Sequence, residues 1–99
     1  MIMLTGSERK YLRGLAHSFK PVVLVGKGGL TERVLDSLDR ALDDHELIKV
    51  KFNEFKEEKK TLSRQIEEKA KAETVGLIGN VAIFYREQKD ERKRKINLK

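Results

Sequence analysis

The sequence predicts an α/β fold in which helices and a mixed four-stranded sheet form two layers. Three observations support this class. Short apolar segments alternate with amphipathic helical segments in the order αβαβαββ. Each strand–helix–strand unit favours a right-handed parallel crossover. Two closing apolar segments, separated only by Gly79-Asn80, indicate an antiparallel hairpin. The length of 99 residues corresponds to one domain.

The first expected element is a helix over about residues 7–18. Thr5-Gly-Ser-Glu8 fits a capping box, in which the Thr5 hydroxyl and the Glu8 carboxylate satisfy free N–H groups at the helix start. The apolar positions follow helical spacing and comprise Tyr11, Leu12, Leu15 and Phe19. Pro21 ends this segment.

A strand is expected next, over residues 22–25. Its residues are apolar without alternation, which is expected of a strand that is covered on both sides or lies inside a parallel sheet. After a glycine-rich loop, Thr31 is the predicted N-cap of a second helix. The buried stripe of that helix is predicted to comprise Val34, Leu35, Leu38, Ala41 and Leu42.

The second half of the chain predicts one more helix and three strands. Residues 47–52 alternate as a strand with Lys49 and Lys51 on its polar face. A third helix over about residues 58–72 buries Leu62, Ile66 and Ala70. Strands follow over residues 74–78 and 81–85. We therefore divide the chain into a domain over 1–86 and a basic, flexible tail over 87–99.

Composition excludes several classes of protein. There is no cysteine, and only two histidines occur, so neither a disulfide nor a conventional zinc site is expected. No apolar run approaches the roughly 18 residues that span a bilayer. The serines and histidines form no recognisable catalytic spacing. We expect a cytoplasmic, monomeric protein that is no enzyme and has no metal, cofactor or membrane partner.

The net charge of +6 is unevenly distributed. Residues 1–29 carry +4, residues 30–58 carry −4, residues 59–85 carry +2 and residues 86–99 carry +4. The chain thus has basic ends around an acidic middle. Basic proteins attract polyanions, and a nucleic-acid backbone is the natural one to consider here.

The strongest candidate site is the loop that contains Gly26, Lys27, Gly28 and Gly29. It offers backbone N–H groups, a cation and a helix N-terminus together at the end of a strand, and all three attract phosphate. The alternative is an ordinary strand-to-helix turn. The residues fit neither a Walker loop nor a dinucleotide fingerprint. Gly76-Leu-Ile-Gly79 has the same spacing, but its apolar middle predicts a structural role.

Cations of the first helix extend this candidate site. The proposed ridge comprises Arg9, Lys10, Arg13, His17 and Lys20, and it contains no compensating acid. A merely solvated helix face is the alternative. His17 is either a phosphate contact or a cap of the first helix, whereas His45 is expected to be structural.

Other possible nucleic-acid contacts are less specific. Arg92-Lys-Arg-Lys95 is a generic polybasic patch. The six aromatic residues are mostly assigned to the core, and Phe55 alone is expected in a connection. No stacking platform for bases is predicted.

Five blocks of residues resemble the CRM domain, named for chloroplast RNA splicing and ribosome maturation, in its stand-alone bacterial YhbY-type form. The resemblance runs from about Leu4 to Arg86. The blocks are Leu15-Ala-His17, Lys20-Pro-Val-Val-Leu-Val-Gly26, Gly29-Leu-Thr31, His45-Glu-Leu-Ile-Lys-Val-Lys51 and Gly79-Asn-Val-Ala-Ile-Phe-Tyr-Arg86.

The resemblance implies a non-catalytic RNA-binding protein that contacts ribosomal RNA in precursors of the large ribosomal subunit and assists their assembly. It implies a fold similar to the C-terminal domain of translation initiation factor three, with the last strand antiparallel between the second and third. It also likens the loop over 26–29 to the RNA-clamping loop of KH domains.

Two other functions remain open from the residues. A protein-interaction adaptor would dock a basic ribosomal partner on the acidic second helix, through Glu32, Asp36, Asp39 and Asp43. A small phosphorylated ligand would instead bind the glycine loop alone.

Overall fold

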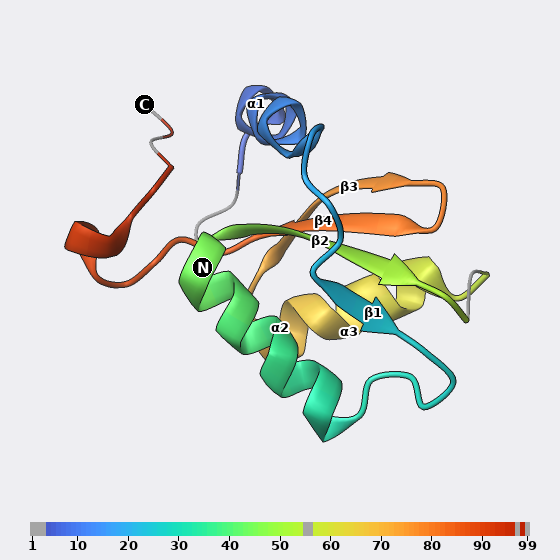
Figure 1. The fold of residues 1–99 in the computed structure, drawn as a ribbon. Coiled ribbons are helices and arrows are strands. Elements are labelled where there is room, and N and C mark those ends of the chain that lie inside the picture. The colour runs from blue at the N-terminus through green and yellow to red at the C-terminus, as the bar shows by residue number, and fades with distance from the viewer. Residues whose placement is uncertain (1–3, 55–56, 97, 99) are drawn as a thin grey trace.

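The computed structural model describes residues 4–54, 57–96 and 98, so the predicted connection at Phe55 lies outside the described residues. The elements are α1 (Gly6–Ala16), β1 (Val23–Val25), α2 (Glu32–His45), β2 (Leu47–Phe52), α3 (Lys59–Ala70), β3 (Glu73–Ile78), β4 (Val81–Tyr85) and a short 3-10 helix, η1 (Glu91–Lys93). The predicted αβαβαββ order is confirmed (Figure 1).

Both predicted helix starts are formed as expected. The Thr5 hydroxyl accepts the Glu8 N–H at 3.1 Å, and the Glu8 carboxylate accepts the Thr5 N–H at 2.8 Å. The Thr31 hydroxyl likewise accepts the N–H of Val34 at 3.2 Å. These bonds satisfy donors that a helix start leaves without intrahelical partners.

The sheet has the strand order β1-β2-β4-β3. β1 pairs with β2 in parallel, and β4 is antiparallel to both β2 and β3. The last strand therefore lies between the second and third, as the resemblance implies. Gly79 has φ of +59° in the two-residue turn that joins Ile78 to Val81, a conformation that glycine adopts readily.

Helices cover both faces of the sheet. α2 and α3 pack on one face, and α1 packs over β2, β3 and β4 on the other (Figure 1). The larger core lies under α2 and α3 and includes Phe52, Phe84 and Leu38, while a smaller one lies under α1 and includes Leu12 and Ile83. The two predicted layers are therefore the sheet and α2–α3, and α1 adds a third.

β1 pairs in parallel with β2 but is neither covered on both sides nor inside the sheet, so the prediction for this strand is wrong. Val23 and Val25 are buried, but Leu24 between them is 54% exposed. β1 is an edge strand, and α1 packs over the other three strands. The part of the sheet that contains Leu24 therefore remains open on the α1 side.

Part of the predicted apolar stripe of α1 is also exposed. Leu12 and Ala16 are fully buried, whereas Tyr11 is 51%, Leu15 37% and Phe19 41% exposed. Helical spacing identifies residues that share a side of the helix, but α1 lies on the sheet as a single outer helix and buries only the centre of that stripe.

Two buried glutamates bind backbone N–H groups of Leu4 and of residues within 88–96. The Glu73 carboxylate accepts the N–H of Leu4 at 3.0 and 3.2 Å. Glu46, at the end of α2, accepts the N–H groups of Gln88 at 2.9 Å, Lys95 at 2.6 Å and Ile96 at 3.1 Å. These contacts place residues 88–96 beside the end of α2, and a domain boundary at residue 86 stays a prediction.

Candidate nucleic-acid interface

The loop over residues 26–29 is a tight turn between β1 and α2. The Gly26 carbonyl accepts the Gly29 N–H at 3.0 Å, and the Gly29 carbonyl accepts the N–H of Thr31 at 3.1 Å. Gly29 has φ of +68°, which favours glycine. Among the described residues, no hydrogen bond uses the N–H of Lys27 or Gly28. The turn thus occupies the Gly29 amide and leaves two neighbouring amides available to a ligand.

The space around the loop is open. A Cβ atom placed on Gly26 would meet nothing within 4 Å, whereas one on Gly28 would lie 3.0 Å from the Thr31 Cγ2. Lys27 is exposed, and α2 begins at Glu32, three residues after Gly29, so its first amides and its positive dipole end follow the loop closely in the chain. Glu32 in the first turn is the nearest acid on this helix. The arrangement can bind a phosphate group by charge and by backbone N–H groups.

Lys51 is a neighbouring cation to which the sequence alone assigns no role in binding. Its Cα pairs with that of Leu24, two residues before the loop begins. The Lys49 ammonium bonds carbonyls of the segment after α1, and side chains two apart on a strand share a face, so Lys51 lies on the α1 side. The alternation of β2 in the sequence indicated that Lys51 lies on a polar face, but the pairing of β2 with β1 was needed to place Lys51 near the loop.

The α1 cations form a separate group. Arg9 pairs with the buried Glu73 at 3.4 Å, and the Arg13 guanidinium donates to the Val75 carbonyl at 3.1 Å. Both contacts lie on β3, at the opposite edge of the sheet from the loop (Figure 1). Arg9 and Arg13 therefore fasten α1 to the sheet, while Lys10 remains exposed. The structure does not unite these three residues with the loop.

Lys20 and His17 form a third group, before β1. Both side chains are exposed, and His17 occupies the C-cap position of α1. Because the glycine loop follows β1 and Lys20 precedes it, the two lie at opposite ends of that strand. His45 is the last residue of α2 and is also exposed.

The polybasic patch of the tail is partly neutralised. Arg92 pairs with Asp90 at 3.3 Å, and Arg94 pairs with Glu87 at 3.4 Å and with Glu91 at 3.7 Å. These exposed pairs contribute little stability. They nevertheless reduce the positive field that the patch presents to a polyanion.

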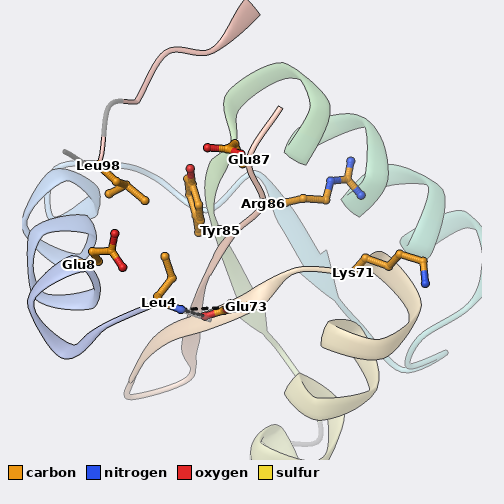
Figure 2. A pocket seen from close by; sticks show the side chains of 8 residues that line it. All are labelled: Leu4, Glu8, Lys71, Glu73, Tyr85, Arg86, Glu87 and Leu98. Carbon is orange, nitrogen blue, oxygen red and sulfur yellow. Dashed lines mark hydrogen bonds between the residues drawn. The ribbon is translucent and has the colours of Figure 1, made fainter. Parts of the chain in front are cut away.

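A cavity of about 380 Å³ lies between α1, the start of β3 and the end of β4 (Figure 2). Its charged and aromatic lining comprises Glu8, Lys71, Glu73, Tyr85, Arg86 and Glu87. Burial, reinforced by the nearby Glu46 and Glu87, raises the pKa of Tyr85 to about 12. Lys71 and Arg86 also line the cavity, so its charges are mixed and carry a net value of about −1, and it does not form a uniformly basic site.

Two other site types are not found in the described part of the chain. Residues 4–54, 57–96 and 98 contain no group of three or more histidines and carboxylates placed to hold a metal ion. Within the same ranges, every helix is too short or too polar to cross a bilayer.

Residues 4–86 match the CRS1/YhbY (CRM) domain. The chain belongs to this family. The matched range is the one over which the sequence blocks resembled it, so that prediction is confirmed. The family is non-catalytic, in agreement with the expectation that the chain is not an enzyme.

Similar proteins come from several bacteria. The chain is 41% identical over 87 residues to a Haemophilus influenzae protein named "RNA-binding protein", with 87% of this chain and 88% of that one covered. It is 33% identical over 91 residues to "Probable RNA-binding protein YqeI" of Bacillus subtilis, with 91% and 95% covered. The solution structure of the hypothetical protein SAV1595 from Staphylococcus aureus matches with a TM-score of 0.78 and 38% identity, covering 96% of this chain and 100% of that chain.

Proposed function

We propose that the protein binds RNA, with the glycine loop over 26–29 as the seat of the sugar-phosphate backbone. One observation carries this proposal: within the described residues, the N–H groups of Lys27 and Gly28 form no internal bond, beside the exposed Lys27 side chain and the start of α2. Phosphate oxygens accept such donors, and backbone contacts of this kind give affinity without sequence preference.

Other cations extend the footprint to different degrees. Lys51 lies nearest along the sheet, because it pairs with Leu24. Lys20 and His17 lie at the other end of β1, and Lys10 is exposed on α1. Arg9 and Arg13 contribute less than their sequence pattern predicts, because their guanidinium groups already bond β3.

The RNA we propose is ribosomal RNA in precursors of the large subunit, whose assembly the protein assists in the cytoplasm as a monomer without a cofactor. The names of similar proteins support RNA as the ligand. The family resemblance supports the ribosomal precursor as its source. The net charge of +6 supports attraction to a long polyanion.

The adaptor alternative is weakened by one contact. Arg86 donates to the Asp39 carboxylate at 2.7 Å and to the Asp43 carboxylate at 2.9 Å. Two of the four acids that would dock a basic partner are therefore already paired. Glu32 and Asp36 alone make a small acidic surface.

The test is RNA affinity measured at several salt concentrations for Lys27→Glu and for Lys60→Glu. Lys60 is exposed on α3, so the two variants carry the same net charge. Lys27→Glu should weaken binding to RNAs of unrelated sequence by similar factors. It should also lower the salt slope, which is the slope of log binding constant against log salt concentration, by about 0.7 for each phosphate of a single strand that the variant no longer neutralises. Equal effects of the two variants would contradict the proposed surface.

The ligand and its source are tested separately. If inorganic phosphate or a mononucleotide binds with the same affinity as RNA, the small phosphorylated ligand is favoured instead. Crosslinking in cells, followed by sequencing of the bound RNA, should recover large-subunit ribosomal RNA. Recovery of messenger or transfer RNA alone would contradict the assembly role and leave RNA binding intact.

A further inference from the structure

An apolar groove opens at the start of β1, at the opposite end of that strand from the glycine loop. Its volume is about 530 Å³, within the range of ordinary ligand sites. Its apolar lining comes from the end of α1, the segment after it, β2 and the tail, and comprises Leu15, Phe19, Val22, Leu47, Ile48 and Ile96. Phe19, with 41% of its surface exposed, supplies an aromatic ring to this lining.

The rim of the groove is basic. The polar lining residues are Lys20, His45, Lys49 and Lys95, and none of the described residues that line the groove carries a carboxylate side chain. The cavity in Figure 2 differs, because three carboxylates line it in addition to Lys71 and Arg86. An apolar floor with a cationic rim suits a flat, apolar group that carries phosphates at its edge.

The wall that carries Phe19 is held in place by the fold. The Lys49 ammonium donates to the carbonyls of His17 at 3.2 Å and Phe19 at 3.1 Å. The Phe19 N–H bonds the Ala16 carbonyl at 2.9 Å, and the Val22 N–H bonds the Lys49 carbonyl at 3.0 Å. Lys49 therefore positions the segment rather than serving as a free cation. The backbone at Phe19 is already held in place before a ligand binds.

β1 connects the groove to the glycine loop. Val22 lines the groove and Gly26 opens the loop, and four residues of extended chain span about 13 Å. Leu24, which is 54% exposed, lies between them on the open part of the sheet, with Lys51 as its partner. About four nucleotides at the stacked spacing of roughly 3.4 Å fit this distance.

We infer that the groove binds an unpaired base of the same RNA strand whose backbone lies on the glycine loop, with the base against Phe19 and the adjacent phosphates on Lys20 and Lys95. This inference rests on the proposed RNA-binding function. It adds a base contact to a surface that the loop alone would make purely electrostatic. The preference is for single-stranded RNA, because a paired base is not free to enter the groove.

The test compares a single-stranded oligonucleotide of about twelve adenosines, long enough to span the loop and the groove, with an abasic ribose-phosphate chain of equal length. Wild-type protein should bind the oligonucleotide more tightly than the abasic chain. Phe19→Ala should lower the affinity for the oligonucleotide about tenfold, since stacking on one aromatic side chain contributes on this scale. The affinity for the abasic chain should stay unchanged. Ile78→Ala, which changes an exposed apolar residue outside the groove, should alter neither.

The outcomes separate this inference from the proposed function. If Phe19→Ala matches Ile78→Ala while Lys27→Glu weakens both ligands, the groove does not hold a base and the loop assignment stands. If no variant affects binding, the proposed function fails as well. If Phe19→Ala instead changes the sedimentation of the protein alone, the groove joins two copies of the chain and the inference is overturned.

Thermal unfolding of each variant is the control that shows whether it is folded. Val22→Thr gives a second probe of the groove, because it keeps the side-chain size at a position that is 53% exposed. It should reduce the preference for the oligonucleotide over the abasic chain without lowering the unfolding temperature. A preference that survives both Phe19→Ala and Val22→Thr would contradict the base contact.

Discussion

The two Gly-x-x-Gly segments of this chain have the same spacing and opposite surroundings. Residues 26–29 lie between an edge strand and a helix, and a Cβ on Gly26 would meet open space. Residues 76–79 lie at the end of β3 and in its hairpin. The Arg13 side chain occupies the space beside Gly76, because a Cβ there would lie 2.9 Å from the Arg13 Cδ.

This comparison shows that glycine spacing by itself does not identify a binding loop. In the second segment Leu77 pairs with Ala82 and Ile78 with Val81, so this stretch belongs to the sheet ladder. In the first, the amides of Lys27 and Gly28 form no internal hydrogen bond among the described residues. Substitution of Gly26 in the first segment should therefore affect RNA binding without affecting stability, and substitutions of Gly76 and Gly79 in the second should do the reverse.

The largest effect is expected for Gly79→Ala. Gly79 has φ of +59°, and an L-residue there costs about 1–2 kcal/mol of unfolding free energy. Gly79→Asn should lose less, because asparagine tolerates this conformation better. Urea unfolding measures both, and RNA affinity should stay unchanged. A loss of RNA affinity in the folded Gly79→Ala protein would contradict the purely structural role assigned to residues 76–79.

Gly26→Ala should produce the opposite pattern. Its Cβ has open space, so the unfolding free energy should not change, but the methyl group would hold a phosphate away from the loop amides. We expect a loss of about 1 kcal/mol in binding, or roughly fivefold in affinity. Gly14→Ala, another open glycine but on α1, is the matched control and should bind RNA normally.

A smaller effect is expected for Gly76→Ala, and it should depend on Arg13. The added methyl group displaces the Arg13 stem and weakens its bond to the Val75 carbonyl, at a cost of about 0.5–1 kcal/mol. In an Arg13→Ala background the same change should cost nothing. A double-mutant cycle by urea unfolding measures this coupling. Additive effects would show that Arg13 does not occupy the space beside Gly76.

The smallest effect concerns the exposed α1 cation. Lys10→Gln should leave stability unchanged and lower the salt slope of RNA binding by about 0.7 or less, because Lys10 lies away from the loop. Arg9→Gln, by contrast, should lower stability, since it leaves the buried Glu73 without its ionic partner. An unchanged slope for Lys10→Gln would confine the RNA footprint to β1 and the loop.

Local rules predicted the elements well. Thr5 with Glu8, and Thr31 with Val34, form the caps that the sequence indicated. The turn at Gly79-Asn80 was equally local. The position of β4 between β2 and β3 came from the family resemblance, because strand order depends on contacts between distant segments that spacing does not encode.

The candidate site was only partly predictable. The loop over 26–29 was identified from its context, but the role of Arg9 and Arg13 was not, since their partners lie more than 60 residues away on β3. Exposure of Leu24 was missed because an apolar run looks the same on an edge strand as on a covered one. Exposure of Phe19 was missed because helical spacing does not show how much of an apolar stripe the sheet covers. Lys51 was placed near the loop only by strand pairing.

The most direct test of the loop assignment is an NMR titration of the isotope-labelled protein with a short single-stranded RNA, followed through the backbone amide signals. The largest shifts should occur at Lys27, Gly28 and the first turn of α2, with little change at Leu77 and Ile78. Saturable binding with shifts confined to α1 and β3, and none over 26–29, would contradict the account.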